Sequence, residues 1–226
     1  MKTARLFAPI FAVVLLANPA ALPAAEDQPY DLSGFVSIFD GQTLDGWRPL
    51  RPNAGGMWTV EDGSIVGGQG ESAGGGLLVT DRIYKNYELY GEVYTTWPLD
   101  TGFFLRILPD RRHYQITIDY RPTGEIGAVY GPFPGGGGGY FQHCPLGLSH
   151  WNPHEYNKVL VRIENNPPRI RVWVNGDKIN DYQDLYYDNQ PAFPDSGHVG
   201  IQVHAGESWG QGSKVAFKNL MIKELK

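Results

Sequence analysis

The sequence lacks several features on which other classes of protein depend. It has a single cysteine, Cys144, in 226 residues, so no disulfide can form within the chain and the fold must rest on its core. No run of lysine and arginine offers a surface for phosphates, which argues against nucleic acid as a partner. After residue 25 there is neither sustained helical periodicity nor a solenoid or propeller repeat. These absences indicate a self-supporting domain that is not mainly helical.

Common catalytic signatures are also missing. The chain has no Gly-x-Ser-x-Gly elbow of a serine hydrolase and no Gly-Lys-Ser/Thr ending of a phosphate loop. It has no Glu-x-Asp-x-x-Glu strand of the laminarinase type, because residue 90, between Glu88 and Glu92, is a tyrosine. His143 and Cys144 are adjacent, but no second metal-type partner lies at ligand spacing, so we do not assign them to a site.

Residues 1–25 resemble a secretory signal peptide. Lys2 and Arg5 form a positive start, Leu6–Ala17 is apolar, and small residues lead to cleavage positions at Ala24 and Ala25. The apolar run is short for a membrane span, although an uncleaved anchor is the alternative. We therefore expect an exported protein, periplasmic or extracellular, with no membrane span after cleavage and with one domain over residues 26–226.

The remaining sequence is rich in turn residues and aromatics. It holds 29 glycines, 17 prolines and 13% aromatic residues, which favours short strands. Asn175-Gly176 is the strongest of several hairpin signals, and 132–139 and 183–196 are predicted loops. An all-β fold, an antiparallel β-sandwich or jelly roll, is predicted from the expected strands, which are 35–39, 58–60, 64–66, 77–80, 87–95, 102–108, 113–120, 127–130, 158–165, 169–174, 199–204 and 214–223.

Four of these strands combine an apolar face with a polar one. Because side chains alternate across a strand, odd and even positions of 87–95, 102–108, 113–120 and 199–204 give the two faces. The polar positions carry carboxylates, amides, an arginine, a histidine and tyrosines, and almost no lysine. This mixture favours a sugar, because polar groups bind hydroxyls and rings cover its C–H face. The alternative is an ordinary solvent-facing sheet surface.

The candidate site residues come mainly from these positions. His204 exchanges a proton near neutral pH. Glu92 and Asp119 suit a base or a metal ligand. Arg106 can stabilise an oxyanion or form an ion pair with Glu92. We expect the catalytic residues to be His204, Glu92 and Asp119. We expect the substrate-binding residues to be Arg106, Gln115, Gln202, Tyr130 and Trp151.

A series of short motifs in order resembles one known family. The opening stretch is similar to its FDGKTLDGW signature, a later one to its TGAIYG element, and the last to VxFRNIRIKEL. The matching stretches, in chain order, are 39–47, 58–63, 77–80, 84–89, 123–131, 174–176, 200–204 and 215–225. Together they resemble the 3-keto-disaccharide hydrolase family over nearly all of residues 35–225. The resemblance implies a concanavalin A-like (lectin/glucanase) jelly roll that is exported.

The resemblance also implies cleavage of 3-keto-glycosides. A ketone at C3 acidifies the C2 proton, a base removes it, the glycosidic oxygen leaves C1, and water adds to the product. Such chemistry needs a base, a stabiliser for the enolate and an acid. His204 or Glu92 would transfer protons, and Arg106 and Gln202 would hold the enolate or sugar. No cofactor is certain, and a divalent metal is a candidate for the stabiliser.

Two stretches depart from the family pattern. Asp100-Thr101-Gly102 replaces the usual Asn-Ser-Gly, and Tyr114-Gln115-Ile116-Thr117 replaces Tyr-Glu-x-Gln. Such changes are compatible with altered specificity or with no activity. A noncatalytic glycan-binding module on the same fold is therefore the alternative function, and a structural protein of the cell envelope is a third. The sequence specifies neither the sugar nor the oligomeric state.

Overall fold

The computed structural model describes residues 30–70, 73–96, 99–132, 137–185, 194–210 and 212–226. The chain divides into a short N-terminal unit, residues 1–31, and a unit of residues 32–226. The predicted signal peptide lies outside the described residues. No helix in the described ranges has the length and apolar character needed to cross a membrane.

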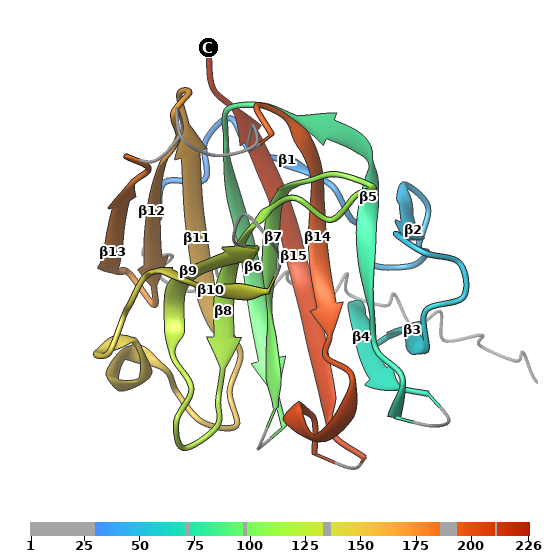
Figure 1. The fold of residues 1–226 in the computed structure, drawn as a ribbon. Coiled ribbons are helices and arrows are strands. Elements are labelled where there is room, and N and C mark those ends of the chain that lie inside the picture. Colours follow the sequence, from blue (N-terminus) through green and yellow to red (C-terminus); the bar gives the residue numbers. More distant parts are fainter. Residues whose placement is uncertain (1–29, 71–72, 97–98, 133–136, 186–193, 211) are drawn as a thin grey trace, which may run out of the picture. The chain divides into compact units, whose positions relative to one another are not determined.

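Residues 32–226 form two antiparallel sheets that pack face to face (Figure 1). The first sheet has the order β13-β12-β11-β6-β15-β4-β3, with β1 paired to β15. Its strands are β1 (Val36–Ser37), β3 (Gly56–Glu61), β4 (Ser64–Gln69), β6 (Tyr87–Thr95), β11 (Asn157–Glu164), β12 (Arg169–Val174), β13 (Asp177–Gln183) and β15 (Lys214–Glu224). We call it the eight-stranded sheet.

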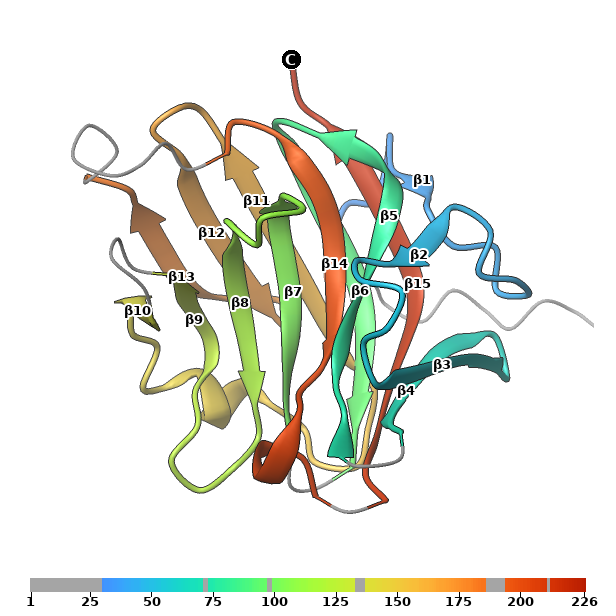
Figure 2. The same ribbon diagram turned by 45° about the vertical axis from the view of Figure 1, so that its right-hand side comes forward.

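The second sheet has seven strands in the order β10-β9-β8-β7-β14-β5-β2. Its strands are β2 (Trp47–Pro49), β5 (Gly76–Tyr84), β7 (Asp100–Ile107), β8 (Tyr114–Asp119), β9 (Ile126–Pro132), β10 (Gly138–Gln142) and β14 (Gly197–Val203). Two short 3-10 turns, η2 (Gly147–His150) and η4 (Gly206–Ser208), follow β10 and β14. The ends of β8 and β14 point to the same edge of this sheet (Figure 2).

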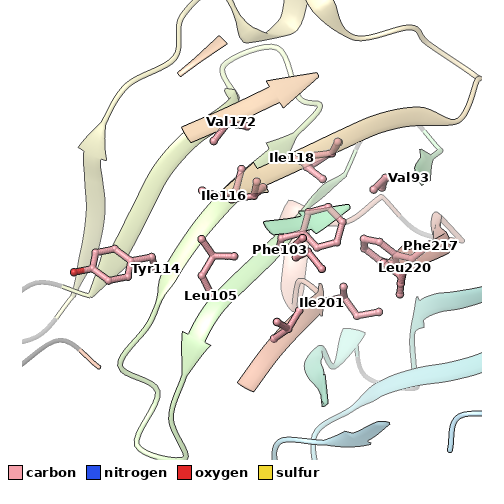
Figure 3. Close-up of a cluster of buried hydrophobic side chains, with 14 of the residues drawn as sticks. Val93, Phe103, Leu105, Tyr114, Ile116, Ile118, Val172, Ile201, Phe217 and Leu220 are labelled. Carbon is pink, nitrogen blue, oxygen red and sulfur yellow. The ribbon is translucent and has the colours of Figure 1, made fainter. Parts of the chain in front are cut away.

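The core fills the space between the sheets. Phe103 of β7 meets Phe217 of β15 edge to face, with ring centroids 5.6 Å apart, so this pair joins the two layers. Figure 3 shows these rings among aliphatic side chains such as Ile116, Ile201 and Leu220. One continuous cluster of buried residues holds both sheets, as expected of a sandwich that has no disulfide.

The predicted fold class is confirmed. The Asn175-Gly176 signal forms the β12–β13 hairpin, and both residues have positive φ, at 51° and 98°. The prediction missed β2, β10 and β13. These are edge or near-edge strands with weak alternation, and β10 lies partly within the predicted loop 132–139.

Candidate functional site

The outer face of the seven-stranded sheet gathers most of the predicted polar residues. Ile116 and Ile118 of β8 and Ile201 and Val203 of β14 point into the core. The alternate residues therefore face outward, and they include Gln115, Thr117, Asp119, Gln202 and, after the end of β14, His204. The parity argument is thus confirmed for β8 and β14.

Asp119 is held by an arginine that follows it in the chain. Arg121 donates from Nε and Nη2 to the two Asp119 carboxylate oxygens, each at 2.6 Å, and its Nη2 lies 3.4 Å from Asp100 Oδ2. A Cβ on Gly124 would lie 2.4 Å from Asp119 Oδ1, so the glycine allows this close approach. Asp119 is 4% exposed, and both of its carboxylate oxygens are bound by Arg121. It therefore suits the role of a fixed negative charge better than that of a general base.

Asp100 and His204 form a second polar pair on this face. His204 Nε2 lies 3.7 Å from Asp100 Oδ2. His204 Nδ1 lies 2.7 Å from the Ala205 carbonyl oxygen, which can only accept, so Nδ1 carries a proton and Nε2 is the ring atom that faces Asp100. Burial, opposed by the charge of His204, aided by that of Asp119 and opposed by that of Arg121, raises the pKa of Asp100 to about 6. The Asp100 carboxyl of this pair therefore changes its protonation state close to neutral pH.

Two amide side chains lie on the same face, that of Gln115 on β8 and that of Gln202 on β14. Gln115 Nε2 donates to Gln202 Oε1 at 3.2 Å, which joins β8 to β14 across β7. The residue between them on β7 is Gly102, where a Cβ would come within 3.1 Å of Gln115 Nε2. The glycine leaves room for the two amides to meet, and their remaining donors and acceptors suit sugar hydroxyls.

The β9–β10 hairpin borders this face and stands in front of β8 in Figure 1. Tyr130 and Tyr140 pack edge to face at 5.5 Å, and Tyr140 lies 4.6 Å from the His143 ring. His143 Nδ1 is 2.6 Å from Glu125 Oε1. Burial, with the charges of Asp119, Glu125 and Asp100, raises the pKa of Tyr140. The hairpin thus adds aromatic rings beside the carboxylates.

A pocket of about 460 Å³ opens beside His204 and Gln202. Leu50, Leu77 and Phe104 form an apolar part of its lining. The His204–Asp100 pair therefore lies between a polar surface on β7 and β8 and a partly apolar pocket next to β5. This arrangement can hold a sugar on one side and its substituent on the other.

The donor set does not fit a resident metal. Asp119 is bound by Arg121, whose charge also reaches Asp100. Within the described ranges, no three His, Cys, Asp or Glu side chains gather into a metal-binding group. These side chains therefore do not form a site for a divalent cation.

Glu92 is not part of this face, so the expectation that it joins His204 is wrong. Residue 92 lies on β6, in the other sheet, where it points outward. Its carboxylate accepts from Asn219 Nδ2 at 2.8 Å and from the Tyr90 hydroxyl at 3.1 Å, and Lys218 Nζ lies 3.5 Å away. Parity gave the correct side of the strand but not which sheet the strand joins.

Arg106 does not lie on the polar face either. Its side chain is therefore not placed to stabilise an oxyanion there, and among the described residues it forms no ion pair with Glu92. Arg106 has φ of 50°, opposite a register shift in β14, and this bulge reverses the alternation of β7. Ile107 consequently joins Phe104 in an outer apolar cluster, and Arg106 turns inward with no exposed surface. Its guanidinium donates to Lys85 O at 2.7 Å, Asn86 Oδ1 at 3.1 Å and Asn165 O at 3.3 Å.

Trp151 lies apart from the polar face. It is 5% exposed and belongs to the main core, 6.4 Å from the Tyr120 ring. A separate shallow pocket beside it includes Pro153 and His154.

The sequence argument missed Asp100, Arg121 and Tyr140. Asp100 has the parity of Phe104 on β7, so extending the predicted strand by two residues would have placed it on the polar face. Arg121 follows Asp119 at i+2, a spacing with no specific signal. Tyr140 belongs to β10, which was expected to be partly loop.

Comparison with known proteins gives relatives by sequence and by fold. A protein from Bacteroides thetaiotaomicron named 3-keto-disaccharide hydrolase is 34% identical over 99 residues, which cover 39% of this chain and 33% of the relative. The match thus spans about a third of the relative's length.

Two solved structures share the fold. A Parabacteroides distasonis protein described as a candidate glycosyl hydrolase aligns with TM-score 0.58 and 22% identity, over 85% of this chain and 94% of its own. A carbohydrate-binding module from Bacillus subtilis aligns with TM-score 0.59 and 12% identity, over 79% and 96%. At these identities the likeness concerns the fold.

The family assignment rests on a match over most of the chain. The sequence model of the 3-keto-alpha-glucoside-1,2-lyase-like domain matches residues 34–223, which include the polar face and all the described strands except the last residue of β15. The family predicted from the short motifs is therefore confirmed, and the chain belongs to the 3-keto-alpha-glucoside-1,2-lyase-like family.

Proposed function

We propose that the protein cleaves 3-keto-glycosides on the outer face of the seven-stranded sheet, with the His204–Asp100 pair transferring protons. The observation that carries the proposal is this pair, whose Nε2 and Oδ2 atoms lie 3.7 Å apart beside both the amides and the pocket. The family membership and the name of the Bacteroides thetaiotaomicron relative support the substrate class.

The proposed reaction begins at C2 of the sugar. His204 Nε2 takes the C2 proton, which the C3 ketone has made acidic, and the Asp100 carboxylate stabilises the resulting imidazolium. The C1–O bond then breaks and its electron pair leaves with the substituent. Water adds to the unsaturated sugar, so that the net products are a 3-keto sugar and the free substituent.

Other residues of the face would bind rather than react. The Gln115 and Gln202 amides suit the sugar hydroxyls, and the Asp119–Arg121 ion pair supplies a fixed charge distribution near the developing enolate. Tyr130 and Tyr140 would cover one flank of the ring.

The test uses purified protein with 3-keto-trehalose and an aryl 3-keto-glucoside. We expect release of sugar or phenol, a slower rate with substrate deuterated at C2, and a loss of about 10²–10⁴-fold in kcat/KM in His204→Gln. Absence of release from both substrates would contradict the proposal.

The alternative is a glycan-binding module, which the Bacillus subtilis neighbour makes relevant. It predicts saturable binding without release, and binding that survives His204→Gln but falls in Tyr130→Ala. Export to the periplasm or beyond remains part of the proposal and is tested by N-terminal sequencing of the protein recovered from each cell fraction.

A further inference from the structure

The pocket beside His204 has an apolar floor and a basic rim. Phe104, on the floor, is 3% exposed, and its ring lies tilted against that of His113, with centroids 4.6 Å apart; burial lowers the pKa of His113 to about 4. His113 is therefore neutral at physiological pH. Arg51 and Arg111, both exposed, belong to the lining. A flat apolar group with a negative charge at its outer end matches this lining.

These two arginines are distinguished by their lack of partners. Arg48 lies 3.2 Å from Asp81, and Arg112 lies 2.9 Å from Asp110. Within the part of the chain that the structure describes, neither Arg51 nor Arg111 has an ion pair or a side-chain hydrogen bond. Two guanidinium groups that no carboxylate of the described residues neutralises give the rim a positive potential, which attracts an anionic ligand.

The lining also lacks a carboxylic acid. Among the described residues that form it there is no aspartate or glutamate, and His204 supplies the imidazole of this lining. His204 is already engaged at C2 in the proposed reaction. A leaving oxygen directed into this pocket therefore departs without a carboxylic acid to protonate it. A phenol, with a pKa of about 10 as in tyrosine, leaves as its anion far more readily than a sugar alcohol does.

We infer that this pocket receives an aromatic leaving group that carries a carboxylate, so that the substrates are 3-keto-glycosides of phenolic acids. The inference rests on the proposed function. The C2 proton passes to His204 Nε2, the C1–O bond breaks, and the electron pair stays on the phenolate oxygen. Water adds across the sugar double bond and the proton returns to solvent, so the net reaction is glycoside plus water to 3-keto sugar plus phenol.

Each part of the ligand has a matching part of the pocket. The ring lies on the floor of Leu50, Leu77 and Phe104, and the carboxylate reaches Arg51 and Arg111. The glycosidic oxygen remains at the side of the pocket formed by Gln202 and His204. A disaccharide would instead place several hydroxyls on the apolar floor without partners, which disfavours it.

The experiment compares two substrates that differ in one group. We would measure kcat/KM for the 3-keto-glucosides of 4-hydroxybenzoate and of 4-methylphenol, in the wild type and in Arg51→Gln/Arg111→Gln. The ratio of carboxylated to neutral substrate is expected to fall about tenfold in the double variant, as when a hydrogen bond to a charged group is lost. Arg82→Gln, an exposed arginine of β5 paired with Glu224, is the matched control and should keep the wild-type ratio.

A binding measurement separates this inference from the proposed function. Free 4-hydroxybenzoate is titrated into each variant and followed by calorimetry, with 4-methylphenol as the neutral comparison. If no 3-keto-glycoside is cleaved but 4-hydroxybenzoate binds in an arginine-dependent way, the reaction is wrong and the pocket assignment holds. If cleavage occurs but neither the substrate ratio nor the binding of 4-hydroxybenzoate changes in Arg51→Gln/Arg111→Gln, the pocket assignment is overturned.

Discussion

At the scale of single residues, Asp100 determines how the site responds to pH. Burial raises its pKa to about 6 from 3.8, so the folded protein binds this proton more tightly than the unfolded chain does. The contribution of Asp100 to stability is therefore present below pH 3.8 and is lost as pH rises through 6. Relative to Asp100→Asn, the wild type should lose stability over that range, which urea unfolding at several pH values would measure.

The same ionisation should appear in catalysis. If the carboxylate stabilises the imidazolium, kcat/KM rises with pH through about 6. Asp100→Asn should lower kcat/KM about 10²-fold and remove that rise. A variant with an unchanged pH profile would show that Asp100 does not act on His204.

The ion pair between Asp119 and Arg121 should also contribute to the stability of the fold. Arg121→Gln leaves a nearly buried carboxylate without its bidentate partner, since the Asp119 side chain is 6% exposed. We expect a loss of about 2 kcal/mol, less than for a fully buried pair because Arg121 is 32% exposed. Arg121→Gln/Asp119→Asn should recover part of it in urea unfolding, and a double variant less stable than Arg121→Gln would contradict this account.

At the scale of elements, Arg106 holds the end of β7 against two neighbouring turns. Its guanidinium donates to backbone or side-chain oxygens of residues 85, 86 and 165, which lie after β5 and after β11. Arg106→Met removes a fully buried donor from these partly buried acceptors, and we expect a loss of about 3 kcal/mol. Arg162→Met, which removes a partly exposed ion pair on β11, should cost about 1 kcal/mol or less. Equal losses in the two variants would argue against this role.

The strands also show how far sequence reasoning reaches. Alternation correctly gave the outward residues of β8 and β14, because a regular strand presents every second side chain to one face. It failed at Arg106, because a single left-handed residue in a bulge shifts the alternation and leaves no composition signal. It failed for Glu92, because pairing between strands far apart in the chain decides which sheet a strand joins.

At the scale of the whole molecule, the two outer faces of the sandwich carry different sets of polar side chains. On the eight-stranded sheet, Arg162 pairs with Glu88 at 3.1 Å and with Glu164 at 2.7 Å, and the Lys218 ammonium lies 3.9 Å from the Tyr156 ring. These groups satisfy one another. The seven-stranded face has the His204–Asp100 pair, the amides and a pocket with two arginines that lack a partner within the described ranges. The proposed chemistry therefore belongs to one face.

This separation gives a direct test with two conservative substitutions. Glu92→Gln, on the eight-stranded sheet, removes a charge from a group that Asn219 and Lys218 bind on the far side of the core from His204. We expect it to change kcat/KM by no more than about twofold, because sites that lie apart and share no partners affect each other by only about 0.5 kcal/mol or less. His204→Gln is a substitution of similar size to Glu92→Gln, but it should abolish most of the activity. Comparable losses in both variants would mean that the reaction uses the eight-stranded face, since within the described residues the hydrogen bonds and the ion pair of Glu92 all lie on that sheet.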